Sequence, residues 1–471
     1  MMKKTLFFGI FSLIALVAWK QDSDAKTWEN TKVPADSIIA AIERGDSVEL
    51  YDCEVLEPLI MEGTSVRPDT ITSFIRAWGT TFYDTVSFKH CHFMDELDFH
   101  DDTLAELVYF DRAIFTGNAI FYHVFFEKRA IFNQLNFNRD VSFSQTTFAG
   151  DTDFYNTIFC GTVDFSLTTF DRSADFGLAN FLENADFAYI IFDKSVNFEY
   201  VVFKQNANFY KTVFGGIAVF KYICFYAGDA LFSHTSFKRD ADFSQATFGR
   251  KIDLSNTTFN GEADFFNSRF CGQVSLSYIE FKNILISWQQ LKGHLIFDPS
   301  VCFELMKHFE EKRQLDDADG IYLFAKDLER IGKPWYVRYP EYWSIQLTCG
   351  YGVKPERVLL VSSLIIVFFA FFYTKSNAIE EIEKESRHSR RRRILRSVRR
   401  SFGKRVYDAI YFSVQTFIIG VVPDWHPTDE FLINTRRIRL FKFRTLSMIE
   451  GSLGWILLVL FVVTLTRKFI R

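Results

Sequence analysis

The chain of 471 residues is long enough for two or three domains, and its hydrophobic content of 48% is typical of a folded protein. Its formal net charge of −4 is unevenly distributed, because the middle of the chain is acidic on balance and the segment after residue 386 is strongly basic. The 7 cysteines show no Cys-x-x-Cys spacing, which excludes an evident zinc site or disulfide framework.

The first residues indicate export from the cytoplasm. Lys3 and Lys4 precede an apolar run from Thr5 to Trp19, so residues 1–25 are predicted to be a signal peptide or a short N-terminal anchor. Either version places the residues that follow outside the cytoplasm.

Residues 26–81 are predicted to form an N-terminal cap and a first, irregular coil of the repeat region. Within them, Pro34–Arg44 carries isoleucines at helical spacing, which favours a short capping helix. The irregular coil is expected within Val48–Leu59. A cap is needed because the end of a repeat array exposes apolar side chains and unpaired backbone groups.

Phenylalanine then recurs at alternating spacings of five and six residues from about Phe82 to Phe281. No helix fits this period. The residue two before each Phe is small or β-branched, and the residue directly before it is often Asp or Asn. In extended backbone the small residue shares the inner face with Phe, and the Asp or Asn between them points to water. The pattern therefore predicts a β-solenoid, in which each coil buries its Phe by stacking on its neighbours.

Segments such as Ala185-Asp186-Phe187 and Ala241-Asp242-Phe243-Ser244-Gln245 resemble the pentapeptide-repeat family. The resemblance implies that residues 82–285 form a right-handed, four-sided β-helix with Phe stacked along its axis. Because the spacing alternates between five and six, we expect about 22 residues in each coil and about nine coils.

One face of the expected solenoid carries Asp153, Asp175 and Asn197, each one coil after the one before it. This acidic face could attract inorganic cations or a basic partner, or it could be a solvated surface. The sequence His90-Cys91-His92 looks like a metal site, but in a strand the two histidines share one face and Cys91 takes the other. We therefore predict no metal and no cofactor.

Beyond the repeats, residues 286–350 show helical patterning and are expected to form a helical cap and linker. Residues 351–471 contain two apolar runs, Val358–Tyr373 and Leu446–Thr466, that predict a two-span module in the lipid bilayer. The basic block Arg387–Arg400 between them places the linker in the cytoplasm. The chain is therefore predicted to be an integral protein of the plasma or inner membrane with an extracytoplasmic repeat domain.

The segment Val406–Asp424 resembles the pore helix and filter of two-span potassium channels. The matching positions are Tyr411, Phe412, Ser413, Thr416, Phe417 and Asp424. The resemblance implies a re-entrant pore-like loop in a homo-oligomer, a tetramer if the protein is channel-like. We take the loop residues to be Thr416, Ile418, Ile419, Gly420, Val421, Val422, Pro423 and Asp424.

The filter positions depart from that family. Both filter glycines are replaced, and Val422 and Pro423 resist the backbone conformation that points carbonyl groups inward. The cytoplasmic linker also conflicts with a filter that faces outward. Three alternatives remain open: an inverted module, a third span formed by Val406–Val422, or a misleading basic block.

Glu450 lies at or just inside the last apolar run. An ionisable group within a membrane span suggests function. Alternatively, Glu450 is an interfacial carboxylate that the dipole at the N-terminus of the helix stabilises.

Together these patterns predict a membrane protein whose extracytoplasmic solenoid is joined to an ion-channel-like module that conducts ions through a divergent filter. The alternative is a non-conducting, membrane-tethered scaffold whose solenoid binds an unidentified protein partner. Mimicry of nucleic acid is disfavoured, because export separates the solenoid from a cytoplasmic target. No arrangement of residues indicates an enzyme.

Overall fold

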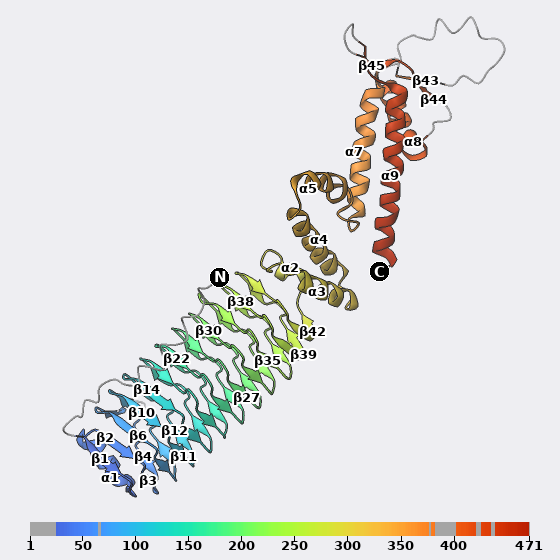
Figure 1. Cartoon of the computed structure of the whole chain (residues 1–471). Coiled ribbons are helices and arrows are strands. Elements are labelled where there is room, and N and C mark those ends of the chain that lie inside the picture. The colour runs from blue at the N-terminus through green and yellow to red at the C-terminus, as the bar shows by residue number, and fades with distance from the viewer. Residues whose placement is uncertain are drawn as a thin grey trace, which may run out of the picture. The chain divides into compact units, whose positions relative to one another are not determined.

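The computed structural model describes residues 25–64, 67–375, 378–381, 402–420, 425–434 and 439–470 (Figure 1). The chain divides into two compact units, of which the first ends at Val301 and the second begins at Cys302. Nearly all of the predicted signal peptide lies outside the described residues, as do the basic block Arg387–Arg400 and the loop positions Val421, Val422, Pro423 and Asp424.

The first unit is a β-solenoid of about twelve coils between residues 26 and 285. A central coil consists of four short strands: β22 (Val163–Asp164), β23 (Thr169–Phe170), β24 (Ala174–Asp175) and β25 (Asn180–Phe181). Each strand pairs in parallel with the equivalent strand of the next coil. Val163, for example, pairs with Ala185, which lies 22 residues further along the chain. The fold class and the length of a coil predicted from the Phe spacing are therefore confirmed.

Three sheets cover the four faces of the solenoid. A 20-stranded sheet runs over two faces, from β3 (Glu54–Val55) and β4 (Leu59–Ile60) to β42 (Glu280–Leu285), and a 10-stranded sheet from β5 (Asp69–Ile71) to β40 (Arg269–Phe270) forms a third. The twelve strands of the remaining face are β1 (Lys26–Glu29), β2 (Val48–Tyr51), β6 (Ile75–Trp78), β10 (Leu97–His100), β14 (Ala119–Tyr122), β18 (Val141–Ser142), β22, β26 (Ala185–Asp186), β30 (Ala207–Asn208), β34 (Ala230–Leu231), β38 (Ile252–Asp253) and β41 (Val274–Ser275).

The core consists of columns of stacked phenylalanine rings. Phe176 and Phe198, one coil apart, lie with their ring centroids 4.9 Å apart and their planes within 3° of parallel. Phe176 also meets Phe187 edge to face at 5.7 Å. Both geometries are favourable for aromatic quadrupoles. Of the two residues before Phe176, Ala174 is buried and Asp175 is half-buried, as the alternation predicts.

The coils begin earlier in the sequence than predicted. Residues 26–81 are not a cap followed by one irregular coil, because β1, β2 and β6 continue the 12-stranded sheet in register. The expected capping helix is present as α1 (Ala35–Arg44), whose Ile38 is fully buried. The Phe spacing missed these coils because their inner positions are filled by residues such as Leu50 and Ala77.

The last coil is covered by α2 (Trp288–Leu291). The side-chain amide of Gln290 donates to the carbonyl oxygens of Phe265 at 2.7 Å and Ser268 at 3.0 Å. These bonds satisfy carbonyl groups that the next coil would otherwise pair.

The second unit is mainly helical. The chain continues through α3 (Pro299–Glu311), α4 (Leu315–Ile331), α5 (Trp335–Glu341), the π-helical turn η2 (Tyr342–Gln346), α6 (Leu347–Cys349), α7 (Pro355–Tyr373), α8 (Phe402–Ile419) and α9 (Phe443–Ile470). Short strands β43 (Ile379–Glu381) and β44 (Trp425–Pro427) pair antiparallel, as do β45 (Phe431–Asn434) and β46 (Arg439–Lys442). By length and composition, α7 and α9 could each cross a membrane.

Candidate functional site: a polar cluster among three apolar helices

Helices α7 and α9 run antiparallel. Tyr373, the last residue of α7, lies beside Glu450 in the first half of α9. At the opposite end, the Arg467 guanidinium donates to the carbonyl oxygen of Tyr351 at 3.0 Å and stacks over the ring of Tyr322 at 4.1 Å. The start of α7 and the end of α9 therefore lie at the same end of the helical unit.

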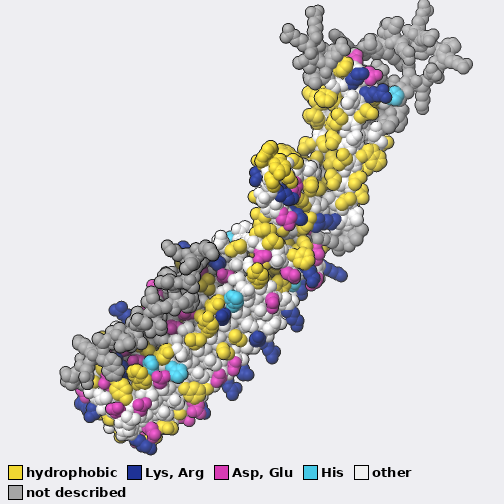
Figure 2. Space-filling view, in the orientation of Figure 1, with side chains coloured by type: hydrophobic (Ala, Val, Ile, Leu, Met, Phe, Trp, Pro, Cys, Tyr) yellow, Lys and Arg dark blue, Asp and Glu magenta, His cyan; other side chains and the backbone are white. Residues whose placement is uncertain are grey.

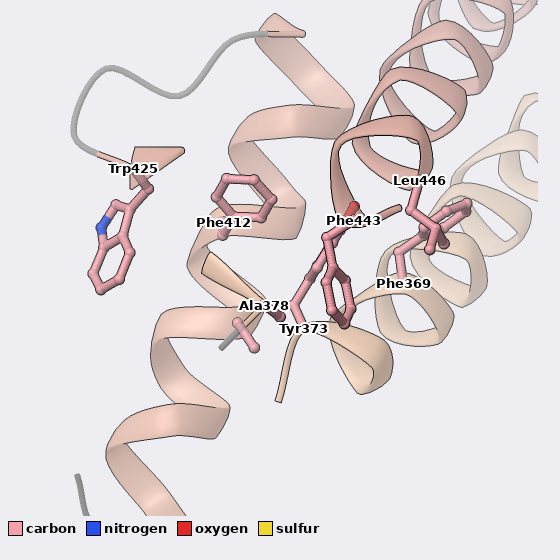
Figure 3. Close-up of a cluster of buried hydrophobic side chains, with 8 residues drawn as sticks. Phe369, Tyr373, Ala378, Phe412, Trp425, Phe443 and Leu446 are labelled. Carbon is pink, nitrogen blue, oxygen red and sulfur yellow. The ribbon is translucent and has the colours of Figure 1, made fainter. Parts of the chain in front are cut away.

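Helix α8 packs between α7 and α9 and links two apolar clusters. The first, called the Tyr373 cluster, contains Phe369, Tyr373, Ala378, Ala409, Phe412, Trp425, Phe443 and Leu446 (Figure 3). The second, called the Val358 cluster, contains Cys349, Val358, Phe417 and Leu457. Since Phe412 lies in the first cluster and Phe417 in the second, α8 descends along α9 toward the start of α7.

The chain then returns to the end from which α8 started. Trp425 lies in the Tyr373 cluster, and the strand β44 that it begins pairs with β43, directly after α7. Among the described residues, β44 thus lies at the same end of the helical unit as the start of α8. The re-entrant loop and the alternative of a third span formed by Val406–Val422 both stay predictions.

Glycines allow α8 and α9 to approach closely. A Cβ atom added to Gly454 would lie 1.9 Å from the Phe417 carbonyl oxygen, and one added to Gly451 would lie 3.4 Å from the Cα of Gly420. Only glycine permits the contact at position 454, whereas the distance at position 451 is an ordinary van der Waals contact. The structure therefore gives Gly454 a packing role between α8 and α9.

Glu450 is completely buried between α7 and α8. The Tyr373 hydroxyl donates to its Oε2 at 2.9 Å, and Ser413 Oγ forms a short hydrogen bond with its Oε1. Ser413 Oγ also lies 2.9 Å from the carbonyl oxygen of Ile366. The Glu450 side chain therefore points into the helix packing, and both its functional and its interfacial interpretation stay predictions.

The hydrogen-bond count of this polar cluster fits a neutral carboxyl group. Ser413 has one hydroxyl proton but faces two acceptors, Glu450 Oε1 and the Ile366 carbonyl. If Glu450 carries a proton, it donates to Ser413, Ser413 donates to Ile366, and Tyr373 donates to the remaining carboxyl oxygen. Each hydroxyl then donates once, and the apolar surroundings hold no unpaired charge.

The described residues of the predicted loop do not share one environment. Thr416 is buried, and its hydroxyl has no hydrogen-bond partner among the described residues, whereas Ile418 and Ile419 are more than half exposed. Gly420 ends α8 in the left-handed conformation with φ 78°, and its amide donates to the Thr416 carbonyl at 2.9 Å. Gly420 is therefore a helix C-cap.

Sequence reasoning missed the part that Tyr373 plays in the site. Tyr373 closes an apolar run and lies 77 residues from Glu450 in sequence. Ser413 was noted only as a match to the channel pattern. No periodicity connects the three residues, so only the packing of the helices brings them together.

The acidic face of the solenoid has the predicted register, since Asp153 pairs with Asp175 and Asp175 with Asn197. Its oxygen atoms already accept hydrogen bonds. Asp175 Oδ1 accepts from the Gly177 amide at 2.8 Å and from the Asn197 side chain at 2.9 Å. The ladder thus fixes the corners of the coils, and its role as a cation or partner site stays a prediction.

The His90-Cys91-His92 segment turns at His90, where φ is 56°, and then enters β9 (Cys91–Phe93). Cys91 is buried, while His92 faces outward and lies 2.8 Å from the Thr116 hydroxyl. Within the described parts of the chain, no group of three or more His, Cys, Asp or Glu residues is arranged to hold a metal ion.

Comparison with known families places pentapeptide repeats (9 copies) at residues 77–125, 132–179 and 227–269. No curated protein and no solved structure matches the chain. No family match supports the resemblance of Val406–Asp424 to potassium channels. The four-sided coils, the Phe columns and the family match agree that the N-terminal part of this chain consists of pentapeptide repeats.

Proposed function

We propose that the protein is an integral membrane protein whose helical unit is a channel-like module that conducts small inorganic cations through a divergent filter. The observation that supports it is that α8 starts and β44 lies at the same end of two antiparallel apolar helices, as a re-entrant α8 would require. A half-crossing helix of this kind places irregular backbone at membrane depth, which is tolerated where protein or a water-filled pathway surrounds it.

The conducting path would require several copies of the chain. In one copy, α8 leaves Tyr407, Ile410, Ile418 and Ile419 exposed. A homo-oligomer, with four copies in a channel-like assembly, would bring these faces together around a common axis. Thr416 and Asp424 are the polar loop residues expected to contact the ion.

The topology that we propose places the repeat domain outside the cytoplasm and the connection between α7 and α9 inside. The start of α7 and the end of α9 lie at one end of the helical unit, so both should face outward. Reporter fusions at Thr27, Lys384 and Arg471 test this arrangement. The proposal includes neither catalysis nor nucleic-acid binding.

A specific observation favours the alternative, a non-conducting scaffold that tethers the solenoid to the membrane for a protein partner. Ile418 and Ile419 are apolar and exposed at the tip of α8, where an ion pathway would need polar groups. The polar atoms of Glu450, Ser413 and Tyr373 are satisfied within one chain instead.

Ion flux from liposomes that carry the purified protein separates the two functions. Potassium, sodium and chloride gradients are tested in turn for the wild type, for Thr416→Val, and for Thr466→Val as a matched control at an exposed position of α9. Ion flux that is present in the wild type and in Thr466→Val but absent in Thr416→Val supports conduction through the loop. Absence of flux from a folded, oligomeric protein overturns conduction and favours the scaffold.

A further inference from the structure

The helical segment that precedes α7 exposes most of its large apolar side chains. Trp335 is 72% exposed, Trp343 63% and Tyr336 62%, and Tyr339 and Leu347 are exposed as well. Most of these residues follow one another at helical spacing along α5, η2 and α6, so they form a single face. A soluble helix has the opposite arrangement, with its apolar face against the core.

Two polar groups of the same segment, the Glu341 carboxylate and the Gln346 carbonyl oxygen, are bound by basic side chains. Lys333 Nζ forms an ion pair with Glu341 Oε2 at 2.7 Å, and the Arg357 guanidinium donates to the carbonyl oxygen of Gln346 at 3.1 Å. The end of the segment is fixed to the spans, because Cys349 is buried in the Val358 cluster. The exposed aromatic face is therefore part of the packed helical unit, and it ends a few residues before α7.

Two arginines lie beside these rings. The Arg330 guanidinium stacks over the Tyr342 ring at 5.2 Å, and that of Arg338 stacks over Tyr339 at the same distance. Arg330, Ile331, Arg338, Tyr339, Tyr342 and Trp343 line an open cavity of about 290 Å³. The nearest acidic contact of Arg330 is Asp327, at 3.7 Å. Figure 2 shows the hydrophobic side chains gathered over α5, with basic side chains at their edge.

We infer that the aromatic face of Trp335–Leu347 lies in the headgroup layer of a phospholipid bilayer, where Arg330 and Arg338 bind a lipid phosphate. This inference rests on the proposed membrane insertion of α7 and α9. Trp and Tyr rings combine an apolar body with a polar tip and collect at membrane surfaces. Arginine pairs readily with phosphate, and its stem can lie along apolar surface. Lipid is favoured over a protein partner because the aromatic face is continuous with α7 and ends close to the residue at which this proposed membrane span begins.

Quenching of tryptophan fluorescence by brominated lipids tests the inference on the full chain in vesicles. Phosphatidylcholine brominated near the headgroup should quench Trp335 and Trp343, so the double variant Trp335→Phe/Trp343→Phe should lose most of the shallow quenching. Lipid brominated near the chain ends should quench Trp455, which is 55% exposed within α9. Trp78→Phe, on the solenoid, is the matched control and should change neither signal.

The outcomes distinguish this inference from the proposed function. If Trp455 is quenched and the Trp335/Trp343 pair is not, the interfacial inference is overturned while membrane insertion stands. If lipid brominated near the chain ends does not quench Trp455, the proposed membrane insertion is overturned, and the interfacial inference is overturned with it.

Lipid binding in detergent tests the arginine pair separately. Phosphatidylglycerol should bind the wild type several-fold more tightly than Arg330→Gln/Arg338→Gln, and Arg112→Gln on the solenoid should behave as the wild type. Equal binding by the wild type and the double variant would overturn the assignment of the phosphate to these arginines. Inorganic phosphate that competes as well as the lipid would overturn the lipid as the occupant.

Discussion

Gly454 of α9 lies directly against the carbonyl oxygen of Phe417 in α8, so that a Cβ atom at position 454 would be 1.9 Å from that oxygen. Alanine favours a helix over glycine by up to ~1 kcal/mol, but the added methyl group must push two backbones apart. We expect Gly454→Ala to destabilise the helical unit by about 1–3 kcal/mol, the usual cost of overpacking. Thermal unfolding in detergent measures this loss.

Gly403, near the start of α8, is the matched control for this substitution. A Cβ atom there has no heavy atom within 4 Å, so Gly403→Ala should be neutral or slightly stabilising. If both variants unfold at the same temperature, α8 does not lie against α9 as described.

Glu450 should tolerate conversion to an amide better than removal of its side chain. In Glu450→Gln the amide oxygen can accept from Tyr373 and the NH₂ group can donate to Ser413, as a neutral carboxyl group does. Glu450→Ala leaves both hydroxyl groups buried without this partner, which costs about 1–3 kcal/mol. Thermal unfolding in detergent should therefore rank Glu450→Gln close to the wild type and Glu450→Ala well below it.

Glu356→Gln, at an exposed position in the first turn of α7, controls for the loss of a carboxyl group as such. Equal losses of thermal stability for Glu450→Gln and Glu450→Ala would show that the carboxyl group is ionised in the folded protein. The assignment of a neutral carboxyl group to Glu450 would then be wrong.

The solenoid should be far more sensitive to loss of a stacked ring than to loss of a buried hydroxyl group. Phe165 stacks on Phe143 at 4.9 Å and on Phe187 at 5.2 Å, and Phe165→Ala should cost ~3–5 kcal/mol. Thr168 donates to the Phe143 carbonyl at 2.7 Å. Ile190, one coil later, and Val201, one and a half coils later, occupy corresponding corner positions and are buried. Because a branched apolar side chain fits such a corner, Thr168→Val should cost about 1 kcal/mol.

Denaturant unfolding followed by circular dichroism measures both variants on the full chain. Because a solenoid is stabilised by contacts between neighbouring coils, the loss at Phe165 should also reduce cooperativity. Similar losses for the two variants would contradict a core dominated by the aromatic columns.

The repeat region could be predicted because its information is local. Each Phe defines its own coil, and the pairing of Val163 with Ala185 follows from the spacing alone. The corners could not be predicted, since bulky residues such as Leu167 and Tyr189 adopt left-handed conformations with φ near 60°. Intrinsic preference disfavours that conformation. The stack imposes it, because the Leu167 amide donates to the Ala188 carbonyl in the next coil at 3.0 Å.

The site in the helical unit depends on information that is not local. Glu450 stood out as an ionisable residue in an apolar run, but whether it faces lipid, water or protein depends on how α7 and α8 pack around it. The return of the chain at Trp425 likewise follows from strand pairing between segments that share no sequence pattern. The resemblance to channel modules favoured a re-entrant loop but could not identify Tyr373 as a partner of Glu450.

Asp186 belongs to a second ladder of Asp and Asn side chains, on the face formed by the 12-stranded sheet. It pairs in register with Asp164 on one side and Asn208 on the other, and its Oδ1 accepts from the Ala188 amide and the Asn208 side chain, both at 2.9 Å. Burial, together with the charge of Asp164, raises the pKa of Asp186 above its ordinary value. The folded state therefore binds this proton more tightly than the unfolded state does.

Because the pKa of Asp186 is higher in the folded state, its contribution to stability falls as the pH rises from the ordinary aspartate pKa of about 4 through the raised pKa of the folded state. Above that raised pKa the contribution stays low. Asp186→Asn should thus stabilise the solenoid at neutral pH, by roughly 1 kcal/mol if it removes one repulsion between adjacent charges in water. The gain should disappear in acid, where the carboxyl group is protonated. Exposed Glu183 in the same coil provides the control Glu183→Gln, and denaturant unfolding at neutral and acidic pH measures both variants. A stabilisation by Asp186→Asn that is the same at both pH values would rule out the raised pKa as its cause.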